Sequence, residues 1–309
     1  MSTSVKIIIR GMGIALVFVL ALGTLAIFLK DGDSPKTVGV QSFFKNSIIH
    51  ENQIGGIIFP AFRELFSRKQ LPDILGASIV FDGMEIKTTA GIEVSDNVVT
   101  ITQAGIYFIS GQSSDGMIVV DYEGEDEVTL ILNGLHLKSQ TGPAVYIKKS
   151  GDANIFLVEH SKNFIADAKQ YNPKFKEKVT GTIYSTADLD ILGRGSLTVY
   201  GNYNDAIVSK DDPYITDATL GVHSVDDGIR GKDSLEIENA NIQITAKGDG
   251  LKSDNKESEE KSYIRIASTT MEISAGGDAI TAQNIIDIES GDITISLSLI
   301  HISEPTRPY

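Results

Sequence analysis

Cysteine and tryptophan are both missing from the 309 residues of the sequence. Without cysteine, the chain has no disulfide framework, no thiolate metal site, no cysteine nucleophile and no lipidated cysteine. Basic residues are also scarce, because 27 Lys and Arg stand against 41 Asp and Glu, which gives a formal net charge of −14. Such a charge opposes binding to nucleic acid and to anionic lipid, so nucleic acid is excluded as a partner of the soluble part.

Recognisable catalytic motifs are absent as well. The sequence contains no nucleophile elbow, no phosphate-binding loop and no dinucleotide fingerprint. The five histidines are scattered and do not have the spacing of metal ligands. Carboxylates are plentiful, but no pair stands out as a glycosidase pair. The sequence therefore identifies no catalytic residue, which leaves enzymatic activity uncertain and favours a non-catalytic function.

An apolar run from Gly11 to Leu29 carries no charge and follows the basic residues Lys6 and Arg10. As a helix rising ~1.5 Å per residue, this run would span the ~30 Å hydrocarbon core of a bilayer. The sequence therefore predicts a transmembrane signal anchor, and a cleaved signal peptide is the alternative. The basic residues before the run predict a single-pass protein of the cell membrane with the bulk of the chain extracytoplasmic.

The whole sequence divides into four parts. Residues 1–30 hold the basic cytoplasmic tip and the anchor, and residues 31–76 form a fairly apolar juxtamembrane linker. Residues 77–296 form the main domain, which we expect to be truncated. Residues 297–309 depart from the preceding pattern and read like the translation of a sequencing-library adapter. We expect this tail to be non-native, and a natural terminal strand is the alternative.

The main domain consists of short β-branched runs separated by Gly, Asn and Asp, which predicts strands. After residue 180 the sequence repeats, and Asp205, Asp227 and Asp249 are each 22 residues apart. Asp278 follows after 29 residues, and the polar insertion 255–261 accounts for the longer interval. Repeats of this length predict a solenoid. Three short alternating strands per repeat favour an all-β parallel β-helix, with inward Ile, Val and Leu stacked in ladders.

Six strings within residues 79–295 stand out, namely TITQAGIYFISG (100–111), DGMIVVD (115–121), VTLILNG (128–134), GSLTV (195–199), GNYNDAIVSKDD (201–212) and DDGIRGKDSL (226–235). Together these strings resemble the bacterial carbohydrate-binding β-helix domain. The last two strings are the most specific. The resemblance implies a right-handed parallel β-helix with a pectate-lyase-like fold, which binds calcium and acidic plant polysaccharide of the polygalacturonate type.

The aligned aspartates are the candidate metal ligands. If successive coils lie ~4.8 Å apart, neighbouring carboxylates repel one another by about 1 kcal/mol even in water. A bound Ca²⁺ would remove this repulsion, because Ca²⁺ binds several carboxylate and carbonyl oxygens. The alternative is that each Asp caps backbone N–H groups at a turn. The candidates are Asp205, Asp226, Asp227, Asp249 and Asp278.

Candidate sugar-binding residues lie close to this column in the sequence. Lys210, Lys232 and Arg230 could pair with uronate carboxylates, and Tyr203 could stack on a sugar ring. The alternatives are ordinary ion pairs, also for Lys252, and packing of the tyrosines. We therefore expect a membrane-anchored, non-catalytic protein that binds acidic polysaccharide with calcium. A calcium-dependent lyase with Arg230 or Lys232 as base, or a structural spacer or adhesin, are the other hypotheses.

Overall fold

The structure is a computed structural model, and it describes residues 6–11, 14–21, 24–31, 34–38, 77–83, 85–89, 92–175, 179–258 and 260–297. The chain forms two compact units, Met1–Leu71 and Pro72–Tyr309. The predicted linker 31–76 is described only at residues 31 and 34–38, and the predicted tail only at Leu297.

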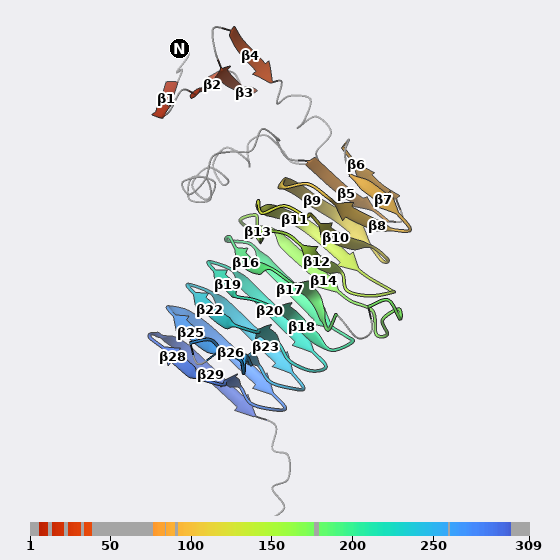
Figure 1. The fold of residues 1–309 in the computed structure, drawn as a ribbon, viewed down its shortest axis with the longest axis vertical. Coiled ribbons are helices and arrows are strands. Elements are labelled where there is room, and N and C mark those ends of the chain that lie inside the picture. Colours follow the sequence, from red (N-terminus) through yellow and green to blue (C-terminus); the bar gives the residue numbers. More distant parts are fainter. Residues whose placement is uncertain are drawn as a thin grey trace, which may run out of the picture. The chain divides into compact units, whose positions relative to one another are not determined.

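The first unit contains four antiparallel strands in the order β1-β2-β3-β4 (Figure 1). They are β1 (Lys6–Gly11), β2 (Ile14–Ala21), β3 (Thr24–Asp31) and β4 (Ser34–Val38). The sequence predicts a transmembrane helix over residues 11–29, where the structure describes strands at residues 14–21 and 24–31, and the membrane anchor stays a prediction. The run is rich in Ile, Val and Phe, which favour strands. None of the described elements is a helix with the length and hydrophobicity that a membrane crossing requires.

The described part of the second unit is built from strands without a helix. One sheet, called here the first sheet, contains nine strands, and they are parallel except for β7, which pairs antiparallel with β8. In spatial order they are β7 (Glu93–Ser95), β8 (Val98–Ile101), β10 (Met117–Asp121), β12 (Val145–Lys149), β15 (Gly181–Ser185), β18 (Asp205–Ser209), β21 (Ile229–Gly231), β24 (Leu251–Ser253) and β27 (Ile280–Ala282).

The other sheet has sixteen strands and two arms that meet at β11 (Val128–Lys138). Residues 128–132 of β11 pair with β13, and residues 136–138 pair with β14. The first arm holds β13 (Asp152–Leu157), β16 (Asp188–Leu192), β19 (Pro213–Thr216), β22 (Ser234–Glu238), β25 (Tyr263–Ala267) and β28 (Ile285–Ile288). The second arm holds β14 (Lys162–Ala166), β17 (Ser196–Gly201), β20 (Thr219–Ser224), β23 (Asn241–Ala246), β26 (Thr269–Ala275) and β29 (Gly291–Leu297). Three more strands join this sheet: β9 (Gly105–Ser113) pairs with β11, β5 (Ala77–Asp82) pairs with β9, and β6 (Glu85–Thr88) pairs with β5.

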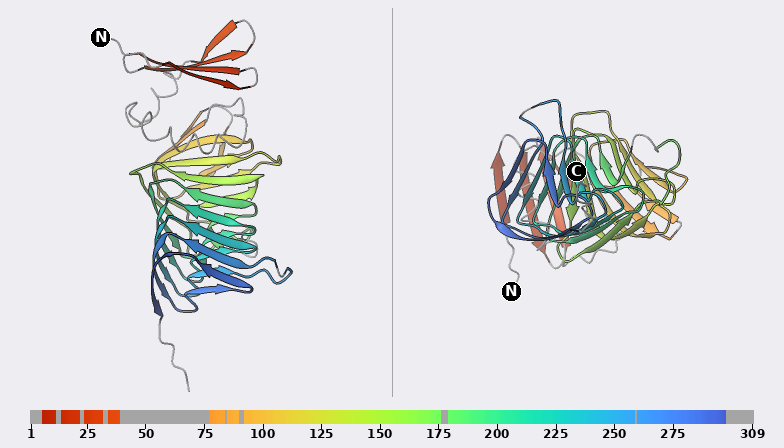
Figure 2. Two further views of the ribbon diagram at one scale, coloured as in Figure 1. Left: turned by 90° about the vertical axis from the view of Figure 1, so that its left-hand side faces the viewer. Right: turned by 90° about the horizontal axis from the view of Figure 1, so that it is seen from below.

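From β12 onward, each set of three consecutive strands places one strand in the first sheet and one in each arm, and we call such a set a coil. Figure 2 shows the coils stacked in sequence order. Each strand pairs in parallel with the equivalent strand of the next coil, as β18 does with β21 and β21 with β24. The all-β, parallel-strand architecture that the repeat predicts is therefore confirmed.

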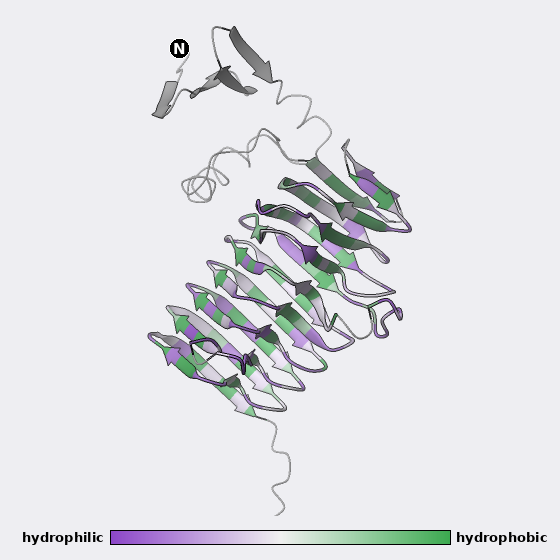
Figure 3. Cartoon of the chain, viewed as in Figure 1, coloured by the Kyte–Doolittle hydropathy of each residue, from purple (hydrophilic) through white to green (hydrophobic). Residues whose placement is uncertain are grey.

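The core lies between the three faces and consists of stacked aliphatic ladders. In the first sheet, Val145, Ile183, Ile207, Ile229 and Leu251 occupy the same register position in successive coils. Each of these side chains is at most 1% exposed. Along β23 and β26 buried apolar residues alternate with exposed polar ones, and Figure 3 shows green and purple segments interspersed along the strands. The strand period of two residues therefore directs Ile, Val and Leu inward and the polar side chains outward.

Candidate functional site

The repeated aspartates form one column at the turns that lead into the first sheet, and we call it the aspartate ladder. The backbone N–H of Asp227 donates to Oδ1 of Asp205 at 3.1 Å, and that of Asp249 donates to Oδ1 of Asp227 at 2.9 Å. The N–H of Asp278 donates to Oδ1 of Asp249 at 2.8 Å. Each of the first three carboxylates thus accepts a hydrogen bond from the coil that follows it. The Oδ1 atom of each of these three side chains therefore caps a backbone N–H group, as the capping interpretation predicts.

Lys252 neutralises part of the aspartate ladder from the outward face of β24. Its Nζ lies 2.9 Å from Oδ2 of Asp227 and 2.9 Å from Oδ2 of Asp249. Burial alone would lower the pKa of Lys252, but its hydrogen bonds to these two carboxylates raise the pKa above its ordinary value. Lys252 therefore has the ion-pairing role that the sequence offers as one alternative.

Asp205 lacks such compensation, although it is the most deeply buried member of the aspartate ladder. Its side chain is 1% exposed, and its Oδ2 has no hydrogen-bond partner. The nearest cation is Arg230, whose Nη1 lies 4.0 Å from Oδ2 while its Nη2 lies 2.5 Å from Oδ2 of Asp254. Burial, and then the neighbouring Asp227, raise the pKa of Asp205 to about 6. The carboxylate of Asp205 thus carries an oxygen that a further cation could satisfy.

Three of the five predicted metal ligands come together at this point. Asp205, Asp226 and Asp227 each offer one carboxylate oxygen, and these oxygens lie within 4.8 Å of one another. Gly248, the next-coil equivalent of Asp226, leaves room for them, because a Cβ there would lie 2.5 Å from Oδ1 of Asp226 and 2.7 Å from Oδ1 of Asp227. Burial, followed by repulsion from Asp227, raises the pKa of Asp226. Clustered carboxylate oxygens of this kind are the ligands that a hard cation such as Ca²⁺ prefers.

The predicted basic residues belong to the same coils. Arg230 lies on the outward face of β21, in register with Lys252, while Lys210 and Lys232 directly follow β18 and β21. Nζ of Lys232 lies 3.7 Å from Oε2 of Glu257. Lys210 is exposed and forms no ion pair within the part of the chain that the structure describes. Partial desolvation of its ammonium group, and then the positive charge of Arg230, lower the pKa of Lys210.

Tyr203 is placed differently from the basic residues. Its ring stacks on that of Tyr171, with centroids 4.1 Å apart and planes at 18°. Both tyrosines belong to an apolar cluster that also contains Phe175 and Tyr184, outside the main core. This stack favours the packing role for Tyr203 over an open platform for sugar.

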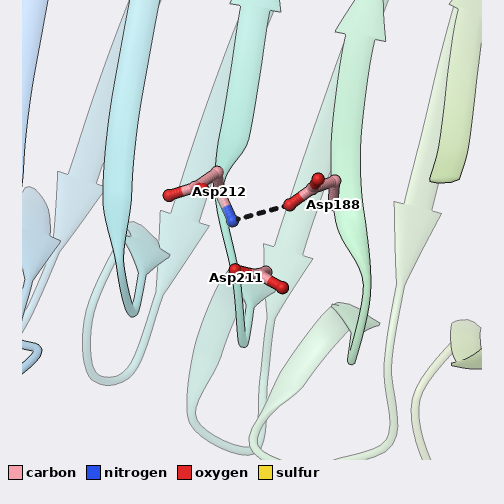
Figure 4. A group of neighbouring side chains, drawn as sticks. All are labelled: Asp188, Asp211 and Asp212. Carbon is pink, nitrogen blue, oxygen red and sulfur yellow. Dashed lines mark hydrogen bonds between the residues drawn. The ribbon is translucent and has the colours of Figure 1, made fainter. Parts of the chain in front are cut away.

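A second acidic cluster lies beside the first arm. Figure 4 shows Asp188, Asp211 and Asp212, each of which offers an oxygen within 4.8 Å of the others. The backbone N–H of Asp212 donates to Oδ1 of Asp188 at 3.2 Å. Burial and the charge of Asp188 raise the pKa of Asp211 to about 6. The sequence pattern does not mark this cluster, because Asp188 lies ahead of Asp205, the first of the repeated aspartates, and only the pairing of Leu189 with Pro213 aligns Asp188 with Asp212.

Comparison with known proteins places the chain in a family. The family described as "Carbohydrate-binding domain-containing protein" matches residues 95–303. A protein of the same description from Acetivibrio thermocellus is 35% identical over 227 residues, which cover 72% of this chain and 79% of the relative.

A solved structure agrees with this assignment. It is described as the polysaccharide lyase-like protein from C. thermocellum, in a gadolinium derivative. It superimposes with a TM-score of 0.64 at 31% identity and covers 73% of this chain and 98% of that one. The match of the family over most of the second unit, and the two similarities, show that the chain belongs to the family of carbohydrate-binding domain-containing proteins.

Proposed function

We propose that this protein binds acidic, pectin-like polysaccharide through calcium and performs no chemistry on it. The calcium ion would be held by Asp205, Asp226 and Asp227, and it would bridge these carboxylates to those of the sugar. The scaffold would be a right-handed parallel β-helix, as the parallel registers and the three-strand coils support.

One observation carries the proposal, namely the buried Oδ2 of Asp205 without a hydrogen-bond partner inside a group of three carboxylates. Ca²⁺ takes six to eight oxygen ligands, so three protein carboxylates leave positions for water and for a sugar carboxylate.

Charge supports a bridging ion rather than direct binding. A protein with a net charge of −14 repels an anionic polysaccharide unless cations intervene. Lys210 and Arg230 would add local positive charge, and the guanidinium of Arg230 could pair with a uronate carboxylate in bidentate geometry. The sugar would therefore lie along the first sheet, over β18, β21 and β24.

A calcium-dependent lyase is the second candidate, because the solved relative is described as polysaccharide lyase-like. Such an enzyme needs a base that removes a proton beside the uronate carboxylate. Arg230 is poorly suited, since Asp254 and Asp205 raise its pKa against the effect of burial. Lys210 would suit better, because its pKa is lowered. Ultraviolet absorbance of an unsaturated product in a mixture with polygalacturonate and calcium would identify a lyase.

We also propose that residues 1–30 attach the protein to the cell membrane and that the remaining chain is extracytoplasmic. The uncharged apolar run after Lys6 and Arg10 supports this proposal. Fractionation of cells expressing the full chain should place it with the membranes, and removal of residues 1–30 should shift it to the soluble fraction. Full-length protein in the soluble fraction would refute the proposal.

The decisive experiment is a calorimetric titration of the full chain with polygalacturonate, first in calcium and then in EDTA. We expect heat in calcium alone. Asp226→Ala should abolish this heat without harming the aspartate ladder, because the Asp226 carboxylate forms no hydrogen bond or ion pair among the described residues. Asp278→Ala is the matched control, since Asp278 belongs to the ladder but not to the group of three.

Each outcome decides between the hypotheses. Equal heat in calcium and in EDTA would remove the metal from the proposal. Loss of heat in both variants would point to general charge rather than to the group of three. No heat in either buffer would favour a structural spacer or adhesin.

A further inference from the structure

Residues 167–175, which follow β14, contain neither strand nor helix and cover part of the outward face of the first sheet. We call this segment the clasp. Its apolar side chains Ala168, Tyr171 and Phe175 are at most 8% exposed. They pack with outward residues of β10, β12, β15 and β18, which are Met117, Tyr146, Tyr184 and Val208. Because no strand pairing holds the clasp, it should open at a lower free energy than the strands beneath it.

The clasp is bound to residues 202–204, the loop that leads into β18. Oδ1 of Asp167 accepts the backbone N–H of Asn202 at 2.6 Å, and the side chain of Asn202 donates to the backbone carbonyl of Asp167 at 3.0 Å. The hydroxyl of Tyr171 donates to Oδ2 of Asp167 at 2.7 Å, and the ring of Tyr171 stacks on that of Tyr203. The contact between clasp and loop therefore consists of specific partners on both sides.

The same loop sets the position of two candidate metal ligands. Asn204 directly precedes Asp205, and the backbone carbonyl of Asn204 accepts the N–H of Asp226 at 3.2 Å. The N–H of Asp205 donates to the carbonyl of Thr180, which lies between the clasp and β15 in the sequence, at 3.0 Å. A shift of the loop would therefore change the distances among the carboxylate oxygens of Asp205, Asp226 and Asp227.

Electrostatic repulsion connects the state of the clasp to the presence of a cation. Three ionised carboxylates at this spacing repel one another, which favours a wider arrangement of the loop that carries Asp205. Lys252 already pairs with Asp227, whereas Oδ2 of Asp205 has no hydrogen-bond partner. A bound cation would cancel the repulsion and favour the compact arrangement, in which the loop contacts the clasp. Coupling between two sites is reciprocal, so the closed clasp would in turn strengthen cation binding.

We propose that the clasp and the cation site are coupled. A cation bound by Asp205, Asp226 and Asp227 stabilises the closed clasp, and the closed clasp raises the affinity for that cation. The inference rests on the function proposed above, because it takes Ca²⁺ as the ligand of these carboxylates, and it adds the part of the fold that regulates their affinity. Asp167 and Tyr171 are positioning residues, since they act on the cation through residues 202–204.

Limited digestion of the full chain with trypsin measures the opening of the clasp, because Lys169 and Lys174 are exposed residues within it. Cleavage after either lysine should be about tenfold slower in Ca²⁺ than in EDTA, a typical size for coupling between two sites. Mass spectrometry of the fragments identifies the cleaved bonds. Cleavage after Lys256, which is exposed in the loop between β24 and β25, is the internal reference for any effect of Ca²⁺ on trypsin itself.

Calorimetric titration of the full chain with Ca²⁺ alone measures the affinity. Tyr171→Phe keeps the ring that stacks on Tyr203 but removes the hydroxyl that donates to Asp167, so the Kd for Ca²⁺ should rise about tenfold. Asp167→Ala, which removes the acceptor for the loop, should raise the Kd at least as much. Tyr214→Phe is the matched control, because it removes a hydroxyl that donates to Glu238 at 2.9 Å on the first arm, and its Kd should equal that of wild type.

Melting curves separate positioning from a merely structural role. A structural role would lower the melting temperature of Tyr171→Phe equally in Ca²⁺ and in EDTA. Coupling predicts instead that this variant loses part of the rise in melting temperature that Ca²⁺ causes in wild type. The same curves check that each variant is folded.

The outcomes distinguish this proposal from the calcium proposal on which it rests. Equal cleavage of the clasp in Ca²⁺ and in EDTA, or clasp variants that bind Ca²⁺ as tightly as wild type, would overturn the coupling and leave the calcium proposal standing. Protection of the clasp that persists in Asp226→Ala would show that the cation acts elsewhere and would overturn both. A wild-type chain that binds no Ca²⁺ would also overturn both.

Discussion

Replacing Asp205 by Asn should stabilise the protein at neutral pH in the absence of metal. The pKa of Asp205 is raised from 3.8 to about 6, a difference of about 2 units, which corresponds to about 3 kcal/mol at 1.36 kcal/mol per unit. The folded-state pKa of Asp205 lies above the unfolded value, so folding favours the protonated side chain. The protonated Asp205 therefore contributes its full share to the free energy of unfolding below about pH 4, and this share is lost as the pH rises through about 6. At pH 7 the ionised side chain therefore costs about 3 kcal/mol relative to its protonated form.

Asn avoids this cost because it stays neutral, and its Oδ1 can still accept the N–H of Asp227. The amide group of Asn would take the place of Oδ2, which has no hydrogen-bond partner. Burying this amide without a partner lowers the free energy of unfolding by roughly 1 kcal/mol. The net gain at pH 7 is about 2 kcal/mol, or roughly 4–8 °C in melting temperature for a domain of this size. Below pH 4 the gain should disappear.

Urea unfolding of wild type and Asp205→Asn, in EDTA from pH 4 to pH 7, measures this effect. Asp167 and Asp211 also have pKa values raised to about 6, mainly by burial, and they affect both proteins equally, so the difference isolates Asp205. Asp205→Ala, which also removes the acceptor for the backbone of Asp227, should be about 1–3 kcal/mol less stable than Asp205→Asn. A difference between wild type and Asp205→Asn that stays constant over this pH range would refute the reasoning.

Three further predictions concern the scaffold. Ile229→Ala opens a cavity in the fully buried ladder of the first sheet and should lower the free energy of unfolding by about 2–5 kcal/mol in urea, whereas a change below 1 kcal/mol would argue against tight packing. Lys252→Met leaves Asp227 and Asp249 without their shared cation, so the melting temperature should fall in EDTA and recover in calcium; a fall that calcium does not reverse would contradict cation binding there. Asn163→Ala removes side-chain hydrogen bonds to backbone groups of two neighbouring coils and should cost about 1–3 kcal/mol in urea, while an Asn163→Ala variant as stable as wild type would show that water replaces those bonds.

The stacking of the coils could be predicted from the sequence because it depends on periodic positions. Leu235 and Ile237, predicted as inward residues from their alternation, are buried and lie in register with Ile264 and Ile266 of the next coil. The 22-residue interval likewise predicts that the repeated aspartates form one column. Both features repeat, so a single sequence is enough to reveal them.

Other features could not be predicted, for different physical reasons. Asp188 reaches Asp212 only through the strand register, because the segment between β14 and β15 interrupts the repeat before it. The N-terminal apolar run fits a helix and a strand equally well by composition, since Ile, Val and Phe serve both a bilayer and a sheet.

The insertion between β24 and β25 shows that a loop of the scaffold can become longer while the strands on either side keep their register. Asp249 and Asp278 are 29 residues apart rather than 22, yet the hydrogen bond between them is 2.8 Å, as short as those of the regular coils. The added residues also supply Lys261, which pairs with Asp233. A corner of a coil can therefore be lengthened without disturbing the other corners, which makes it an attachment point where protein engineering could graft new recognition loops onto the same core.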